Sequence, residues 1–342
     1  MTLDRPIVVA GAGSIGCFVG GMQAAAGRAV ALLARPRVIQ EIRGNGLRLT
    51  SFEGIDRTIA ADRLTLSGDP QVFADAGLVL VTVKSADTPE IADLIAAHAP
   101  LDAVIVSLQN GIGNVSVLRA GLPGRRVLGG MVPFNVIAPS PGRFHRATSG
   151  DILIEQDDAG TADMLSVPGL KLRATSDISG VLWGKLLVNL NNALNALADL
   201  PLRQQLAQRP WRLLFADQMA EALAVLTAEG IRPVSTTPIP PGWMPHLMRL
   251  PDAAFAVLLA RVMKIDPDAR SSMWEDLQRG RRTEIDHLQG VITEIADRRG
   301  LEVPLSRCIV ALIRHAEAEA RGSPRLTPEQ VRQALIATPV GN

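Results

Sequence analysis

The sequence predicts an α/β fold, with an N-terminal Rossmann-like, doubly wound sheet and a C-terminal all-α domain. Short apolar segments rich in β-branched residues alternate with helical patterns through the first half of the chain, as in a parallel sheet with crossover helices. From about Asp177 onward only helical patterns follow. A glycine-rich turn comes directly after the first apolar segment. We therefore expect two domains, residues 1–176 and 177–342, of which the first binds a dinucleotide.

The glycine-rich turn is the most informative stretch of the chain. It follows the apolar segment Ile7–Ala10 and reads Gly11-Ala12-Gly13-Ser14-Ile15-Gly16. In this pattern the first glycine permits a tight turn, the second lets the backbone approach a pyrophosphate, and the third lets the next helix lie close to the strand. The N–H groups at the start of that helix then receive the anion. Because the motif stands between a predicted strand and a predicted helix, we expect residues 11–16 to bind the cofactor phosphates.

Arg35 indicates which cofactor is bound. It ends the second predicted strand, Ala29–Ala34, nineteen residues after Gly16. Folds that bind NAD usually place an Asp or Glu there for the ribose 2′-hydroxyl, whereas a guanidinium can bind a 2′-phosphate with charge-assisted hydrogen bonds. We therefore expect NADPH rather than NADH. The alternative is that Arg35 is one of many surface arginines.

The composition excludes several classes of protein. The chain has 342 residues, 47% of them hydrophobic and 20% charged, as expected for a soluble globular protein. A net charge of +1 gives no reason to expect a nucleic acid or an anionic membrane as partner. Cys17 and Cys308 lack metal-ligand spacing, so we expect no metal. No signal peptide pattern is present, and the longest apolar stretch, Val181–Leu200, contains Lys185 and four asparagines. We expect a cytoplasmic protein without a membrane span.

Further elements follow from the same patterns. In the first domain, strands are expected at Leu78–Val83, Ala103–Leu108 and Arg126–Met131, further strands or hairpins in Pro133–Ile154 and Lys171–Ala174, and helices at Cys17–Ala26, Pro36–Arg43 and Pro89–Ala97. In the second, helices are expected at Val181–Leu197, Trp211–Glu229, Asp252–Lys264, Ser272–Gly280, Thr283–Arg299 and Leu305–Arg321, with a short final helix after Thr327. The segment 232–251 contains six prolines, so we expect no regular structure there. It is either an ordered loop near the substrate or a solvent-facing connector.

Lysine is rare in this chain, with four lysines among 35 basic residues. Lysine can lose its proton, which arginine does not do. Lys185 lies on a predicted helix, with Asn189 one turn and Asn192 two turns further on, so the three side chains share one face. Hydride transfer from a nicotinamide to a ketone leaves negative charge on the carbonyl oxygen. Lys185 can supply both a positive charge and a proton to that oxygen.

Six motifs in sequence order resemble those of the ketopantoate reductase (2-dehydropantoate 2-reductase) family, over roughly residues 5 to 320. The first is the glycine turn together with Arg35. The others are Val81-Thr82-Val83-Lys84, Gln109-Asn110-Gly111-Ile112-Gly113, Trp183-Gly184-Lys185-Leu186-Leu187-Val188-Asn189, Ser271-Ser272-Met273 and Thr283-Glu284-Ile285-Asp286. Each motif alone is weak, but six at fitting distances are specific.

The resemblance implies an NADPH-dependent reductase that converts 2-dehydropantoate, a small 2-oxo acid, to pantoate for pantothenate synthesis. It implies that Lys185 is the general acid and that Asn110 and Asn189 position the substrate and the nicotinamide. Ser272 and Glu284 would complete the substrate site, with Glu284 accepting a hydrogen bond from the substrate hydroxyl. Lys84 would lie beside the cofactor, at the carboxyl end of a strand.

One departure from the family pattern leaves alternatives open. The family commonly has an asparagine eight residues after the lysine, where this chain has Ala193, and Asn192 comes one residue earlier. The substrate could therefore be another small 2-oxo acid. Independently of this departure, the alternative outside the enzymes is a non-catalytic NADP-sensing protein. Ser272 could instead cap a helix, and Glu284 could be a first-turn carboxylate that the helix dipole stabilises. A homodimer is compatible with the sequence, which does not decide the oligomeric state.

Overall fold

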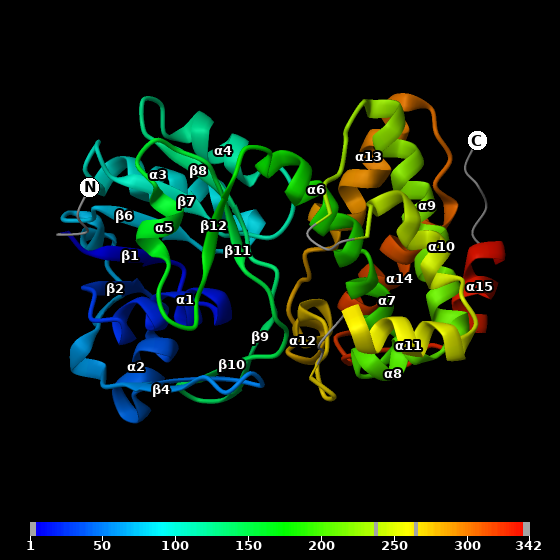
Figure 1. Ribbon diagram of the computed structural model, residues 1–342, viewed down its shortest axis with the longest axis horizontal. Helices are drawn as coiled ribbons and strands as arrows, with labels where there is room; N and C mark the ends of the chain where they lie inside the picture. The colour runs from blue at the N-terminus through cyan, green and yellow to red at the C-terminus, as the bar shows by residue number, and fades with distance from the viewer. Residues whose placement is uncertain (1–4, 236–238, 263–265, 338–342) are drawn as a thin grey trace. The chain divides into compact units, whose positions relative to one another are not determined.

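A computed structural model describes residues 5–235, 239–262 and 266–337. The chain divides into two compact units, Met1–Ile178 and Ser179–Asn342, and each is described by itself (Figure 1). The first is an α/β unit and the second is helical in all of its described elements. The predicted fold class, a Rossmann-like sheet followed by a helical region, is confirmed.

The first unit is built on an eight-stranded sheet with the order β12-β11-β8-β7-β6-β1-β2-β5. Its strands are β1 (Ile7–Ala10), β2 (Val30–Leu33), β5 (Thr65–Ser67), β6 (Leu78–Val81), β7 (Val104–Ser107), β8 (Val127–Met131), β11 (Ile152–Glu155) and β12 (Leu172–Thr175). Six adjacent strands of this sheet, β8, β7, β6, β1, β2 and β5, are all parallel. Strand β11 pairs with β8 in antiparallel orientation. In chain order these six strands run 3-2-1-4-5-6 across the sheet, so the order reverses between β1 and β6. Ligands of such sheets bind at the carboxyl ends of the strands beside this reversal.

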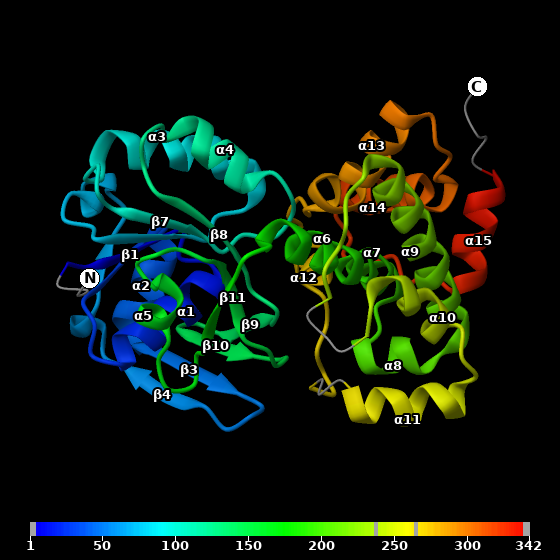
Figure 2. The same ribbon diagram turned by 45° about the horizontal axis from the view of Figure 1, so that its top comes forward.

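Both faces of the sheet are covered, which explains why its strands are continuous apolar runs. In β1, Ile7 and Val9 belong to one core, while Val8 and Ala10 belong to the other. Helices α3 (Thr88–His98) and α4 (Asn114–Gly121) cover the second core, and α1 (Ser14–Ala25) covers the first (Figure 2). The remaining helices of this unit are α2 (Pro36–Asn45) and α5 (Thr161–Leu165).

A second sheet of four strands, in the order β4-β3-β10-β9, packs against α1. Its strands are β3 (Leu47–Ser51), β4 (Asp56–Ile59), β9 (Val136–Ser140) and β10 (Arg143–Arg146). The strands expected in Pro133–Ile154 therefore divide between two sheets, because β11 belongs to the large one. Strands β3 and β4 were not predicted from the sequence, because their hairpin carries charged residues on its exposed face and β3 pairs with β10, far away in the chain.

The helical unit contains α6 (Ile178–Asn189), α7 (Asn191–Ala198), α8 (Leu202–Ala207), α9 (Arg209–Glu229), α10 (Met244–Met248), α11 (Asp252–Val262), α12 (Ser272–Gln278), α13 (Val291–Arg299), α14 (Pro304–Glu319) and α15 (Pro328–Ala337). The long helix α9 contacts α10, α13 and α14. Within the described residues, no helix is both long enough and apolar enough to span a membrane.

Three expectations for the helical unit need correction. The helix predicted at Val181–Leu197 is two helices separated at Leu190. The helix predicted at Thr283–Arg299 begins with a π-helical turn, Asp286–Gly290. The proline-rich segment contains a 3-10 turn, Pro241–Trp243, and the short helix α10. The prediction that prolines exclude regular structure there is wrong, because proline is accommodated in a first helical turn, where no N–H donor is needed. Residues 236–238 of this segment and Lys264 lie outside the described residues.

Candidate active site

The glycine loop after β1 is packed tightly except at one position. Gly11 has φ +99°, and a Cβ there would lie 2.5 Å from Cγ1 of Val83. A Cβ on Gly16 would lie 2.5 Å from the carbonyl oxygen of Gly11. At Gly13, by contrast, an added Cβ would meet no atom within 4 Å. Gly11 and Gly16 are therefore packed against neighbouring protein atoms, whereas the space beside Gly13 is open, so that a phosphate can approach the backbone there.

The start of α1 supplies donors beside this open space. The first helical hydrogen bond runs from Cys17 N–H to the Gly13 carbonyl at 2.8 Å, so the N–H groups of Ser14 and Ile15 have no partner within the helix. A residue just after β6 also holds the loop in place, because the Thr82 hydroxyl donates to the Gly11 carbonyl at 2.6 Å. Positioned donors at a helix N-terminus bind anions. The residues present therefore fit a dinucleotide pyrophosphate.

Arg35 lies just beyond β2, at the N-cap of α2, and is exposed. Two residues further on, Arg37 forms an ion pair with Glu41 at 2.7 Å. Among the described residues Arg35 forms no ion pair. Its guanidinium stands at the strand end where the fold receives the adenosine ribose, which fits a 2′-phosphate.

Lys84 and Asn110 follow neighbouring parallel strands, β6 and β7, and both are partly buried. The structure links their loops directly, because the Ser85 hydroxyl donates to the Asn110 carbonyl at 3.0 Å. Lys84 and Asn110 were predicted as site residues from their motifs, whereas Ser85 was not. The polar residue directly after Lys84 was the signal in the sequence that could have identified Ser85.

Lys185 lies on α6 and is partly buried. Burial lowers the pKa of its amine from 10.5 to about 8, and the negative charge of Glu284 opposes this shift. Two of the predicted site residues therefore interact electrostatically. Because its pKa stays above 7, the amine is mostly protonated at neutral pH, yet it releases its proton far more readily than an ordinary lysine.

The residue before Lys185 explains one feature of the tryptophan-glycine-lysine motif. A Cβ on Gly184 would overlap the carbonyl oxygen of Val234. Val234 N–H also donates to the Gly180 carbonyl at 2.8 Å. The first part of the proline-rich segment therefore packs on the helix that carries Lys185, and glycine leaves the room that this requires.

The asparagines that follow Lys185 separate into two pairs. Asn191 and Asn195 are 6% and 0% exposed, and both hydrogen-bond the side chain of Gln205, at 3.1–3.2 Å and 3.0 Å. Asn189 and Asn192 are partly exposed. The buried pair is thus engaged inside the protein, which leaves Asn189 and Asn192 as the substrate candidates.

The start of α12 is held by Ser271 rather than Ser272. The Ser271 hydroxyl accepts from Trp274 N–H at 3.1 Å and donates to the Asn192 carbonyl at 3.0 Å. Ser271 N–H donates to Oδ1 of Asn195 at 2.9 Å. The alternative in which Ser272 caps the helix is therefore wrong. Ser272 is the next residue, partly exposed, and its position is set by its neighbour.

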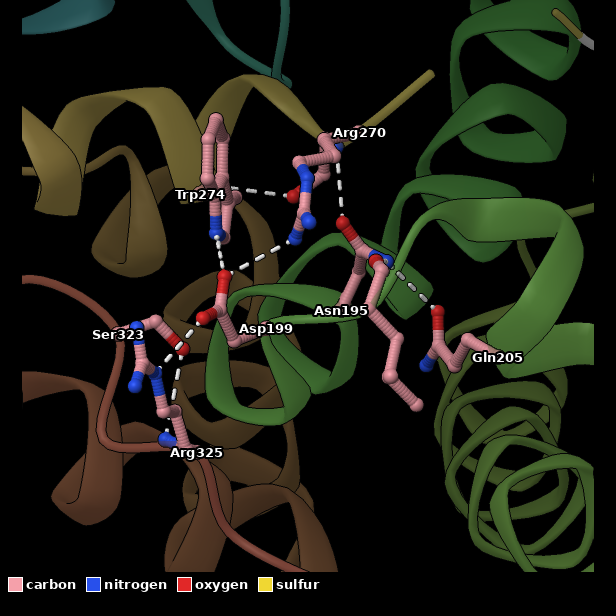
Figure 3. Close-up of polar contacts among 9 residues, drawn as sticks. Asn195, Asp199, Gln205, Arg270, Trp274, Ser323 and Arg325 are labelled. Atoms are coloured by element: carbon pink, nitrogen blue, oxygen red, sulfur yellow. Dashed lines mark hydrogen bonds and ion pairs between the residues drawn. The ribbon is translucent and has the colours of Figure 1, made fainter. Parts of the chain in front are cut away.

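Asp199 also holds the start of α12 in place (Figure 3). Its carboxylate accepts from Trp274 Nε1 at 2.6 Å, from Arg270 at 2.9 Å and from Arg325 Nε at 2.9 Å. The Arg270 guanidinium also stacks on the Trp274 ring, 4.4 Å from its centroid. We call Asp199, Arg270, Trp274 and Arg325 the Asp199 cluster, which was not predicted from the sequence.

Glu284 precedes its helix instead of opening it, because the helical turn begins at Asp286. The Thr283 hydroxyl accepts from Ile285 N–H at 3.2 Å, and Thr283 N–H donates to Glu317 at 2.7 Å. Glu284 thus lies ahead of the first turn, partly exposed, with Lys185 as an electrostatic neighbour.

A Rossmann-like unit whose glycine loop fits a pyrophosphate, followed by a helical unit, is the architecture of a nicotinamide-dependent oxidoreductase. Comparison with known proteins identifies the family. Residues 7–158 match the family model described as ketopantoate reductase PanE/ApbA, and residues 177–317 match the corresponding C-terminal model. The chain belongs to the ketopantoate reductase family, whose members are NADP-dependent oxidoreductases. The resemblance found in the sequence is confirmed.

Individual relatives agree over nearly the whole chain. A 2-dehydropantoate 2-reductase of Halobacterium salinarum is 32% identical over 323 residues, which cover 92% of this chain and 99% of the relative. A crystal structure of a PanE/ApbA family ketopantoate reductase from Ralstonia eutropha JMP134 has a TM-score of 0.77 and 32% identity, with coverages of 92% and 99%. D-mandelate dehydrogenase, solved with NADH and anilino(oxo)acetate, has a TM-score of 0.74 at 20% identity, with coverages of 92% and 99%. This last likeness shows the fold alone.

Proposed function

We propose that this protein reduces 2-dehydropantoate to pantoate with NADPH and that Lys185 is the general acid. The observation that carries the proposal is the lysine itself. Its amine has a pKa of about 8 beside Glu284, within a family whose relatives are named for this reaction. A general acid works best when its pKa lies near the working pH.

When bound, NADPH supplies the hydride that adds to the C2 carbonyl carbon of the substrate. Negative charge then develops on the carbonyl oxygen. The Lys185 ammonium stabilises that charge and donates the proton that completes the hydroxyl group. The partly buried setting strengthens both effects, because the local dielectric constant is lower than that of water.

The other candidate residues take binding and positioning roles in this proposal. The loop Gly11–Gly16 holds the pyrophosphate and Arg35 binds the 2′-phosphate. Lys84 and Asn110 contact the cofactor at the carboxyl ends of β6 and β7, and Asn110 also orients the ketone. On the helical unit, the substrate contacts are made by Asn189, Asn192, Ser272 and Glu284. Glu284 accepts a hydrogen bond from the substrate hydroxyl.

Another small 2-oxo acid is the second candidate substrate. Ala193, which is fully buried, stands where the family commonly has an asparagine, so any substrate contact that the family's asparagine makes is absent from this chain. A site that loses such a contact can favour a less polar substrate. The cytoplasmic location and the homodimer stay predictions.

The test is a spectrophotometric assay of NADPH oxidation against a panel of 2-oxo acids that includes 2-dehydropantoate, repeated with NADH. We expect the highest kcat/KM with 2-dehydropantoate and NADPH. A higher kcat/KM with a less polar 2-oxo acid would identify that acid as the substrate instead. Oxidation with no member of the panel would overturn the reductase and favour an NADP-binding sensor.

A further inference from the structure

A buried polar cluster lies beneath the loops that carry Lys84 and Asn110. We call it the hydroxyl–amide cluster. Its members are Ser85, Thr88, Ser107, Gln109 and Asn114, which are 5%, 1%, 2%, 5% and 6% exposed. Buried polar side chains are costly unless they are hydrogen-bonded, so the bonds within the cluster show what it holds in place.

The cluster forms one directional chain of hydrogen bonds. The Ser107 hydroxyl donates to Oε1 of Gln109 at 3.0 Å, and Gln109 Nε2 donates to the Thr88 hydroxyl at 2.8 Å. The Thr88 hydroxyl donates in turn to Oδ1 of Asn114 at 2.9 Å. Asn114 Nδ2 then donates to the Ser85 hydroxyl at 3.1 Å. Such chains polarise one another and fix a single arrangement of their members.

Two interior members of the chain, Gln109 and Asn114, also bond to the backbone of the candidate site. Gln109 Nε2 also donates to the Val83 carbonyl at 3.2 Å, one residue before Lys84. Asn114 Nδ2 donates to the Asn110 carbonyl at 2.7 Å. The two strand-end loops are thus bonded to one another through side chains that begin α3 and α4.

We propose that Thr88 and Asn114 are positioning residues of the reductase, which hold Lys84 and Asn110 at a fixed separation beside the strand-order reversal. The inference rests on the proposed function. Thr88 is the central link, because its hydroxyl accepts from Gln109 and donates to Asn114. Replacing this hydroxyl with a methyl group removes both bonds and leaves the volume nearly unchanged.

The test compares three variants. Thr88→Val breaks the chain, and Thr88→Ser keeps the hydroxyl. Thr161→Val is the matched control, because Thr161 is 0% exposed and its hydroxyl donates to Asp157 at 2.7 Å, at the start of α5. We expect Thr88→Val to lower kcat about tenfold or more, since small displacements of positioning groups are costly, with the Kd for NADPH changed less than about threefold. Thr88→Ser should recover most of the activity, and Thr161→Val should match the parent.

A second readout does not depend on the substrate. The fluorescence of bound NADPH reports the surroundings of its nicotinamide, and we expect Thr88→Val alone of the three variants to change it. If Thr88→Val behaves like Thr161→Val in both measurements, the positioning role is overturned while the reductase stands. If the parent protein reduces no 2-oxo acid, the proposed function fails, and the fluorescence comparison still decides the positioning role.

Discussion

The two units hold their candidate functional residues by different physical means. In the N-terminal unit, neutral hydroxyl and amide groups, almost wholly buried, join the loops of Lys84 and Asn110. In the helical unit, the start of α12 is tied down by the Asp199 cluster, whose ionic side chains are partly exposed. The side chains of Asp199, Arg270 and Arg325 are 16%, 24% and 80% exposed.

This difference predicts different responses to mutation and to salt. A neutral buried chain carries no net charge to screen, but loss of one member leaves its partners unsatisfied. Partly exposed ion pairs contribute about 0–1 kcal/mol each and weaken as salt rises. We therefore expect the cofactor side to be rigid and the substrate side to adjust more readily.

Replacing Lys185 removes the proposed chemistry from the helical unit and leaves the cofactor unit untouched. We expect Lys185→Ala to lower kcat by roughly 10²–10⁴, the usual contribution of a general acid, with the Kd for NADPH nearly unchanged. Lys185→Arg should remain impaired, because its guanidinium keeps the charge but does not release a proton. Lys171→Ala, at an exposed position, is the control. Unaltered turnover in Lys185→Ala would refute the assignment.

Replacing Arg35 tests the cofactor unit alone. We expect Arg35→Ala to reduce the preference for NADPH over NADH by about tenfold to a hundredfold, as expected for lost charge-assisted hydrogen bonds. The kcat with saturating NADPH should change little. Arg37→Ala is the matched control, because Arg37 is two residues away and paired with Glu41. An unchanged preference would show that Arg35 does not read the 2′-phosphate.

The pH dependence of kcat reports the lysine directly. Its pKa is lowered to about 8, and the protonated form is the acid. The rate should therefore be level below that pH and fall about tenfold per pH unit above it. Substrate reduction followed under saturating conditions from neutral to alkaline pH measures this. A profile that stays level into the range of an ordinary lysine would contradict the lowered pKa, and Asp199→Asn should leave the profile in place.

Loosening the Asp199 cluster gives the smallest expected effect. Trp274→Phe removes the Nε1 bond to Asp199 and keeps a ring beneath Arg270, so we expect a rise of about threefold in the KM for the 2-oxo acid with kcat preserved. The effect of Asp199→Asn should shrink at high salt. Arg325→Gln is the control, because it loses a bond to the same carboxylate without touching α12. A larger effect of Arg325→Gln would show that the cluster secures the C-terminal segment instead.

The fold class followed from local signals, and the structure confirms it. The parallel strands were recognisable because they are buried on both faces and are therefore continuous apolar runs. The β3–β4 hairpin was missed because its pairing with β10 joins segments far apart in the chain. The π-helical turn at Asp286–Gly290 was missed as well, since the local pattern is that of an ordinary helix.

The candidate site shows the same division. Gly11, Gly13 and Gly16 were identified from spacing, because backbone geometry near a phosphate constrains residue type directly. Spacing did not separate Asn189 and Asn192 from Asn191 and Asn195, since helical periodicity places all four within two turns.

By itself, the sequence determined the class of fold, the glycine turn after the first strand and the lysine that stands apart in an arginine-rich chain. These depend on local residue types and their spacing. Only the tertiary structure decided which asparagines are buried against Gln205, which serine caps α12, and which hydroxyl links the loops of Lys84 and Asn110. Those outcomes depend on partners distant in the chain, whose hydrogen bonds form only when packing removes water from both groups.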